Sequence, residues 1–242
     1  MRPIKTDFSY QKYIISNRLH DNYANNHRII EYFGSNSWCG ERVFIIGGGE
    51  SIKDFDFNRL KGYKVITTNL GFLHCNSDIN FSMDSRLYDK IIKGDLNEIH
   101  QKPVNELWKQ YKGIRCFITP QEPKTFGNET CLVKRIREVA VSRDLDSGIH
   151  GGKNSALGAM MLAIALGSTD IYLLGFDMKC QTQSHFHKGY GPRDLDAFNI
   201  KLSQYKKEIE HIAPLIAHQG IKITNCNPNS ELKCFAYTSL YQ

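Results

Sequence analysis

Two histidines in one short segment are the side chains best suited to acid–base chemistry. His185 and His187 stand in residues 184–191, which read Ser-His-Phe-His-Lys-Gly-Tyr-Gly. Imidazole titrates near neutral pH, so either histidine could take a proton from an attacking hydroxyl. Side chains two apart in extended backbone face the same way, so the pair could also bind a metal ion, or both could lie on the surface. A general base is the favoured interpretation, and the residues leave open which histidine it is.

A glycine-rich segment after an apolar run could hold an anion. It follows residues 43–46 and contributes Gly47, Gly48, Gly49 and, two residues later, Ser51. Backbone N–H groups without a neighbouring Cβ can approach a phosphate closely, and a hydroxyl can add to them. The segment matches neither GxGxxG nor the Walker pattern, which disfavours a dinucleotide site and a P-loop site. A tight turn is the structural alternative.

A second glycine-rich segment, residues 147–154, begins with Ser147 and Gly148 and leads into an apolar helix. The first turn of a helix favours an anion, although glycine there could also serve close packing. Polar side chains follow three further apolar runs: Asn69, Asp84 and Asp177. The two carboxylates could bind Mg²⁺, hold a ribose or cap a loop. Because the carboxyl ends of parallel strands share one edge, these groups should gather there.

The elements that must position these residues alternate along the chain. Strands are expected at residues 43–46, 65–68, 79–83, 114–118, 171–174 and 221–224. Helices are expected within residues 85–110, from Asn154 or Ser155 to residue 166, and at about residues 195–219. This alternation predicts an α/β fold: one Rossmann-like domain, residues 41–242, with a mostly parallel sheet and helices on both faces. Residues 1–40 are expected to form a helical segment before it.

Residues 121–146 give the weakest secondary-structure signal in the chain. Their one basic group, Lys134, Arg135 and Arg137, alternates with apolar positions as a solvated helix face would. The formal net charge of +6 could suit an anionic ligand of any size, but the other basic residues are scattered, so the charge by itself predicts no nucleic-acid partner.

Composition limits the class and compartment of the protein. The 242 residues are 41% hydrophobic and 23% charged, as in a soluble globular protein. No apolar stretch reaches the roughly 20 residues of a membrane span, and the first residues lack a secretory h-region, so a cytoplasmic location is expected. The seven cysteines form no C-x-x-C pair, which predicts reduced thiols. An oligomer is possible.

Six segments stand in an order that carries a family resemblance: residues 43–51, 68–69, 147–148, 163–177, 184–185 and 227–230. Together they resemble a superfamily of CMP-sugar transferases. The chain is similar to the bacterial lipo-oligosaccharide sialyltransferases and to the motility accessory factor glycosyltransferases of the DUF115 group. The related 6-hydroxymethylpterin diphosphokinases share much of this core. The most specific part is the helix and strand that end in Gly-Phe-Asp at Asp177.

The resemblance implies a role for each matching residue. The first glycine segment and Ser51 would contact the nucleotide phosphate, and Asn69 would bind the nucleotide or the donor sugar. Ser147 and Gly148 would hold the cytosine or ribose, and Asp177 would lie at the nucleotide. His185 matches the Ser-His dipeptide of both transferase branches.

The sequence also departs from the family. Glu50 replaces the usual proline, and Gly48 stands where the sialyltransferases carry an asparagine. The segment between Asp177 and His185 is too short for the lid and the tyrosine pair with which sialyltransferases hold the CMP phosphate.

These observations predict a glycosyltransferase that uses a nucleotide-activated donor, a CMP-nonulosonate, and a glycan or protein acceptor. No cofactor is required in that mechanism, since His185 or His187 would be the base. One alternative is a Mg²⁺-dependent diphosphokinase, in which Asp84 and Asp177 hold the metal on ATP. The other is a nucleotide-binding module without catalysis.

Overall fold

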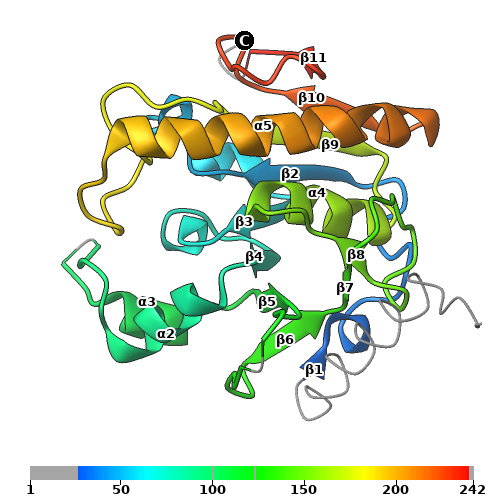
Figure 1. Ribbon diagram of the computed structural model, residues 1–242. Helices are drawn as coiled ribbons and strands as arrows, with labels where there is room; N and C mark the ends of the chain where they lie inside the picture. Colours follow the sequence, from blue (N-terminus) through cyan, green and yellow to red (C-terminus); the bar gives the residue numbers. More distant parts are fainter. Residues whose placement is uncertain (1–26, 100, 123, 240–242) are drawn as a thin grey trace, which may run out of the picture.

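Parallel strands form the centre of the molecule, a computed structural model that describes residues 27–239 except 100 and 123 (Figure 1). Within these residues one sheet has nine strands in the order β1-β6-β5-β4-β3-β2-β9-β10-β11, and every neighbouring pair is parallel. Its strands are β1 (His27–Arg28), β2 (Arg42–Ile46), β3 (Lys64–Thr68), β4 (Ile79–Ser82), β5 (Ile114–Ile118), β6 (Thr130–Val133), β9 (Asp170–Leu174), β10 (Lys222–Asn225) and β11 (Ala236–Tyr237). The short strands β7 (Arg135–Ile136) and β8 (Ile149–His150) pair with each other.

Four described α-helices and four 3₁₀ helices connect the strands. They are α2 (Ser85–Lys93), α3 (Val104–Gln110), α4 (Ser155–Ala165), α5 (Leu195–His218), η1 (Ile29–Glu31), η2 (Glu50–Ile52), η3 (Phe57–Leu60) and η4 (Gly71–Leu73). Polar side chains cap three of the α-helices: Asp84 accepts from an amide of α2, Asn154 from one of α4 and Asp194 from two of α5. These caps fix where each of the three helices begins.

Alternating side chains of the strands bury both faces of the sheet. Along β2, Val43 and Ile45 pack in the core that contains α4 and α5, whereas Phe44 and Ile46 pack on the other face with η2 and η3. Toward β5 and β6, that second face is covered by α2 and α3. Burial on both faces explains why residues 43–46 of β2 are a continuous apolar run in the sequence. The expected α/β class, with a parallel sheet and helices on both faces, is confirmed.

The strand order reverses beside β2. The chain moves from β2 through β3, β4 and β5 to β6 on one side, and later places β9 and β10 on the other. In open α/β sheets, ligands bind at such a switch point, beyond the carboxyl ends of the strands. Here the two flanking ends are the first glycine segment after β2 and the Gly-Phe-Asp segment after β9.

The expected strands lie within one residue of their observed bounds, and the two long apolar helices correspond to α4 and α5. Residues 121–146, whose secondary structure the sequence does not predict, contain β6 and β7. There the expected helix face is wrong: Arg135 lies in β7 and is half-buried, and Lys134 and Arg137 flank that strand. Residues 1–26 of the expected N-terminal helical segment lie outside the described residues, and the described remainder contains β1 and η1. None of the described helices is long and apolar enough to cross a membrane.

Candidate functional site

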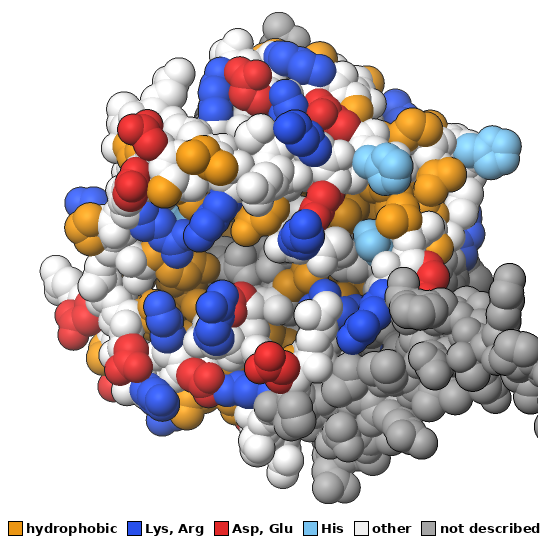
Figure 2. Space-filling model, viewed as in Figure 1, with side chains coloured by type: hydrophobic (Ala, Val, Ile, Leu, Met, Phe, Trp, Pro, Cys, Tyr) orange, Lys and Arg blue, Asp and Glu red, His pale blue; other side chains and the backbone are white. Residues whose placement is uncertain are grey.

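A cavity of about 710 Å³ opens at the switch point. Its walls come from the ends of β2, β3, β4 and β9, the first turn of α4, residues 178–193 and the first half of α5. Figure 2 shows a hollow on this face with Lys and Arg side chains around it. The strand ends that carry the polar groups expected from the sequence therefore line this cavity.

The first glycine segment lines the cavity, but most of its amides are used within the fold. Gly47 N donates to Leu174 O over 2.7 Å, and Gly49 N donates to Gly175 O over 2.9 Å. These two bonds join the ends of β2 and β9. Within the described residues, only the N–H of Gly48 in this triplet has no hydrogen-bond acceptor. A phosphate at this loop would therefore meet one free amide.

Close packing explains why each position of the triplet is glycine. A Cβ on Gly49 would lie 2.5 Å from Cγ of Asp177, and one on Gly48 would lie 2.7 Å from Cδ2 of His185. A Cβ on Gly47 would lie 2.6 Å from the carbonyl oxygen of Gly175. The glycines thus allow the two flanking segments to approach the loop.

Asp177 is buried at the end of β9 and holds several segments together. Its carboxylate accepts from the amide of Ser51 at 2.9 Å, the hydroxyl of Ser51 at 2.5 Å and Nδ2 of Asn227 at 2.9 Å. Ser230 adds a hydrogen bond to the carbonyl of Phe176. Asp177 lines the cavity and Ser51 does not, so Ser51 lies behind the carboxylate rather than at the cavity wall.

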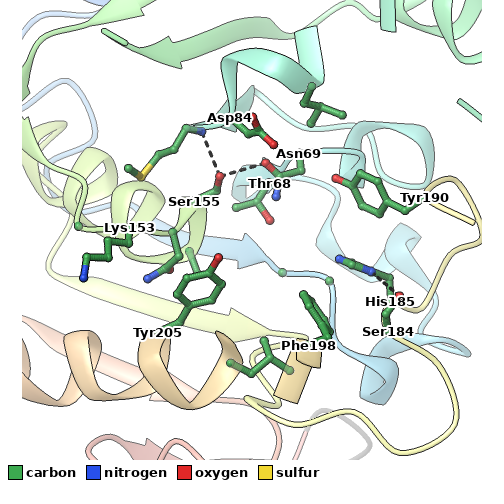
Figure 3. A pocket seen from close by; sticks show the side chains of 18 of the residues that line it. Thr68, Asn69, Asp84, Lys153, Ser155, Ser184, His185, Tyr190, Phe198 and Tyr205 are labelled. Carbon is green, nitrogen blue, oxygen red and sulfur yellow. Dashed lines mark hydrogen bonds between the residues drawn. The ribbon is translucent and has the colours of Figure 1, made fainter. Parts of the chain in front are cut away.

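Asn69 lies at the end of β3 with a φ of 54°, a left-handed conformation that asparagine adopts more readily than most residues. Its Oδ1 accepts from the hydroxyl of Ser155 at 3.0 Å (Figure 3). It also accepts from the hydroxyl of Ser82 at 2.9 Å. Ser155 in turn accepts from the amide of Met83. This network joins β3, β4 and α4, and it fixes the orientation of the Asn69 amide at the cavity wall.

The second glycine segment reaches the cavity only with its last residues. Ser147 donates to Asp144 over 2.6 Å, and the amide of Gly148 donates to Leu145. Neither residue lines the cavity, whereas Gly152 and the first turn of α4 do. The implied contact of Ser147 and Gly148 with cytosine or ribose stays a prediction.

Residues 178–194 connect β9 to α5 without regular secondary structure, and side chains hold them in place. Glu50 accepts from the amides of Gln181, Thr182 and Gln183 through Oε1, and from the hydroxyl of Thr182 through Oε2. Burial raises the pKa of Glu50, but these hydrogen bonds outweigh it and leave the pKa below its ordinary value. The residue that departs from the family pattern therefore fixes this loop.

Two further contacts fix the same loop. Asn199 of α5 bonds both the N–H and the C=O of Cys180, at 2.9 and 3.1 Å. The amide of Phe186 donates to the carbonyl of Gly48 over 3.0 Å. The loop is thereby attached to α5 at one end and to the glycine segment at the other, with the two histidines beside the second attachment.

His185 lines the cavity and His187 does not. The imidazole of His185 points into the cavity, and its Nδ1 lies 3.0 Å from the hydroxyl of Ser184 (Figure 3). His187 is 9% exposed, stacks on His74 at a centroid distance of 5.4 Å, and accepts the amide of Gly189 through Nδ1. The two rings are neighbours, with centroids 5.4 Å apart, but only His185 is placed to meet a ligand.

Both imidazoles are neutral at pH 7. Burial, followed by the charge of Arg193, lowers the pKa of His185 to about 4. Burial lowers the pKa of His187 to about 3, with smaller contributions from His185, His74 and Arg193. A neutral imidazole has a lone pair that can accept a proton.

One apolar stripe of α5 serves two purposes. Its C-terminal half packs in the core through Ile209, Ile212, Ala213 and Ile216. Earlier along the same helix, Phe198, Leu202 and Tyr205 line the cavity instead. Tyr190 joins them from the loop, and burial raises the pKa of both tyrosines, so their hydroxyls keep their protons. The chain thus brings two tyrosines to the cavity from positions after His185.

The charges on the cavity wall favour an anionic ligand. Five cationic side chains, Arg86, Arg135, Lys153, Lys179 and Arg193, stand against three carboxylates, Asp84, Glu122 and Asp177. Three of the cations have carboxylate partners: Arg86 pairs with Asp84, Lys179 with Glu231 and Lys153 with Glu208.

The two carboxylates proposed as Mg²⁺ ligands already have other partners. Asp84 caps α2 and pairs with Arg86, and Asp177 accepts three hydrogen bonds. Among the described residues there is no group of three or more His, Cys, Asp or Glu side chains that could hold a metal ion.

Comparison with known proteins shows a shared fold. No protein-family model and no curated protein sequence matches the chain, so the expected match to DUF115 is not supported. The structure is similar to the MAf glycosyltransferase from Magnetospirillum magneticum AMB-1, with a TM-score of 0.56 and 13% identity over 98% of this chain. The chain spans 39% of that protein's length. A mutant of the α-2,3/8-sialyltransferase CstII gives a TM-score of 0.50 and 17% identity over 82% of this chain and 87% of that one. The chain therefore has the α/β fold of these two glycosyltransferases.

Proposed function

We propose that the protein transfers a sugar from a nucleotide-activated donor, a CMP-nonulosonate, to a hydroxyl of a glycan or protein acceptor. The observation that carries the proposal is the neutral His185, which points into a cationic cavity at the switch point of the sheet. The fold shared with two glycosyltransferases supports it. No cofactor is required in this mechanism.

The cavity offers donors for the phosphate that leaves with CMP. Gly48 with its free amide, the first turn of α4, and Tyr190 and Tyr205 with their hydroxyls all line it. As the bond between the anomeric carbon and the phosphate breaks, negative charge grows on the phosphate oxygens and the sugar gains oxocarbenium character. Donors held in advance by the fold stabilise that charge without reorganising.

His185 would take the proton from the acceptor hydroxyl as its oxygen bonds to the anomeric carbon, which inverts the configuration there. With Nδ1 beside Ser184, Nε2 is the nitrogen available to the acceptor. A base with a pKa of about 4 is weak, but the negative charges of a bound donor would raise that pKa toward neutrality.

Nucleotide binding tests the first part of this proposal. Thermal shifts should be measured with CMP, CDP, UDP, ADP and ATP, with and without Mg²⁺. CMP at about 100 times its dissociation constant should stabilise the fold by about 2.7 kcal/mol, or about 5 to 10 °C in Tm. A preference for ATP that depends on Mg²⁺ would favour the diphosphokinase, and no shift with any nucleotide would refute both enzyme proposals.

Release of CMP from a CMP-nonulosonate in the presence of acceptors tests the second part. His185→Ala should lower turnover by about 10² to 10⁴ with little change in CMP affinity, since the proton moves only in the transition state. His211→Ala replaces an exposed histidine of α5 and is the matched control. Nucleotide binding without turnover by the unaltered protein would support the binding module instead.

A further inference from the structure

The wall of the cavity beside His185 carries a fixed positive charge, the guanidinium of Arg193. Its Cζ lies 4.6 Å from the centroid of the Tyr190 ring and 5.2 Å from that of Phe198. The same two rings contact His185, with centroid distances of 4.7 and 5.2 Å. Aromatic faces attract a guanidinium, so the two rings hold Arg193 close to the imidazole.

Three carboxylates, one next to Arg193 in the sequence and two at the cavity, already have other partners. Its neighbour Asp194 accepts from two amides of the first turn of α5. At the cavity, Asp84 pairs with Arg86, and Asp177 accepts three hydrogen bonds from other segments. No salt bridge in the described part of the chain includes Arg193. A guanidinium that is always charged, held in place and lacking a counter-ion is suited to an oxyanion.

We propose that Arg193 binds the anionic group of the ligand, a phosphate or a sugar carboxylate, and that this contact makes His185 an effective base. The inference rests on the proposed function, because it takes the ligand to be an anionic donor. It adds the residue that recognises the anion and a link between donor binding and proton transfer.

The link follows from the charges that face His185. His187 on one side is neutral, because its own pKa is about 3, and burial keeps Tyr190 protonated by raising its pKa. Arg193 is therefore the charge that acts on the imidazole at neutral pH, and after burial it is the second cause of the low pKa of His185. An oxyanion bound to Arg193 offsets that charge and raises the pKa of His185. By linkage, protonation of His185 and anion binding then favour each other.

Binding measurements with three probes test the contact. CMP carries the phosphate, cytidine lacks it, and a free nonulosonate carries only the carboxylate. Arg193→Ala should weaken binding of the probe that bears the recognised anion by about tenfold to a hundredfold, and should leave cytidine unaffected. Arg193→Lys should retain part of the affinity, and Lys201→Ala, which removes an exposed charge from α5, should bind as the unaltered protein does. Loss of CMP affinity identifies the phosphate, and loss of nonulosonate affinity identifies the carboxylate.

NMR titration of the His185 ring tests the link without any measurement of activity. The bound anion should raise the pKa of His185 by about one unit or more in the unaltered protein. In Arg193→Ala the free protein should already have a higher His185 pKa, and the anion should shift it less.

Two results would overturn the inference: affinities of Arg193→Ala for CMP and nonulosonate within twofold of those of the unaltered protein, or an unchanged His185 titration. If the unaltered protein binds none of the three probes, the proposed function fails, and inorganic pyrophosphate then decides the role of Arg193. Pyrophosphate binding that is lost in Arg193→Ala supports an anion site at this residue. Equal binding, or none by either protein, overturns it.

Discussion

Glu50→Ala should release the loop that carries His185. The carboxylate accepts four hydrogen bonds, three of them from the amides of Gln181, Thr182 and Gln183. A typical hydrogen bond contributes about 0.5–1.5 kcal/mol net, and three donors that share one partly exposed oxygen belong at the low end, so we expect a total of about 2 kcal/mol. That energy corresponds to an increase of about 30-fold in the opening of the loop, because each 1.4 kcal/mol is a factor of about ten.

Hydrogen exchange measures this opening directly, because the amides that bond to Glu50 are themselves the groups whose exchange is followed. Residues 181–183 should exchange about 30-fold faster in Glu50→Ala, and Asp54→Ala, an exposed carboxylate nearby, should leave them unchanged. Glu50→Gln keeps an acceptor oxygen for the amides, so its exchange rates at residues 181–183 should lie between those of Glu50→Ala and those of Asp54→Ala. Exchange in Glu50→Ala within about twofold of the unaltered protein would refute the role assigned to this carboxylate.

The same bonds predict a pH dependence. The pKa of Glu50 is lowered in the fold, because hydrogen bonds to the carboxylate outweigh burial. A group with a lowered pKa contributes its stabilisation above its unfolded pKa, about 4.3, and loses it as the pH falls through the folded value. After correction for intrinsic exchange chemistry, protection of residues 181–183 should therefore be constant from pH 7 to about 5 and decline below about pH 4.

Three other perturbations follow from the same contacts. His187→Phe should reduce the acid sensitivity of the fold. The pKa of His187 is about 3 in the folded protein and about 6.5 in the unfolded chain, so protonation of the unfolded chain lowers the free energy of unfolding by about 2 kcal/mol between pH 7 and pH 5. The variant should keep that free energy, as urea unfolding at both pH values would show. Gly49→Ala should lower Tm and weaken CMP binding in thermal-shift assays, because its Cβ would meet Asp177 at 2.5 Å, and an unchanged Tm would contradict the packing argument. Ser155→Ala should lower CMP affinity by about tenfold in titration calorimetry by loosening the amide of Asn69, whereas equal affinity would remove that amide from the site.

The strands could be predicted because a strand that is buried on both faces of the sheet needs apolar residues at consecutive positions, a signal that is local in sequence. In β2 and β9 this signal is a run of apolar residues, 43–46 and 171–174, and a glycine marks where each strand ends. Parallel pairing then brings those ends to one edge whatever the loops do, so the neighbourhood of Asn69, Asp177 and the first glycine segment follows from the pattern alone.

The purpose of the glycines could not be predicted in this way. The sequence shows where a Cβ is missing, but not which atoms take the space. At Gly48 the space belongs to the ring of His185, a residue 137 positions away (185 − 48), and at Gly49 it belongs to Asp177. Gly48→Val would therefore push His185 aside as well as obstruct a phosphate, so loss of binding in that variant would not separate the two causes.

The helix face expected around Arg135 is wrong for a different reason. Three basic residues among apolar ones span too few positions to distinguish a helical period from a strand period. β6 has four residues and β7 has two, each shorter than an average strand. The position of Arg135 at the cavity wall depends on two strand pairs, β6 with β5 and β7 with β8. Neither pair can be inferred from the residues beside Arg135.

The two halves of the site are stabilised differently, and this has a functional consequence. Asp177, Asn69 and the glycine segment are fixed by strand ends and buried hydrogen bonds, so their geometry is stabilised together with the core. The segment with His185 has one backbone bond to the glycine segment, from Phe186 to Gly48, and its other anchors are single side chains, Glu50 and Asn199, that bond backbone groups of the loop. Changes at those anchors should therefore move the base without disturbing the strand ends. Such variants should lose kcat by a larger factor than they lose CMP affinity, whereas changes at the glycine segment should lower both by similar factors.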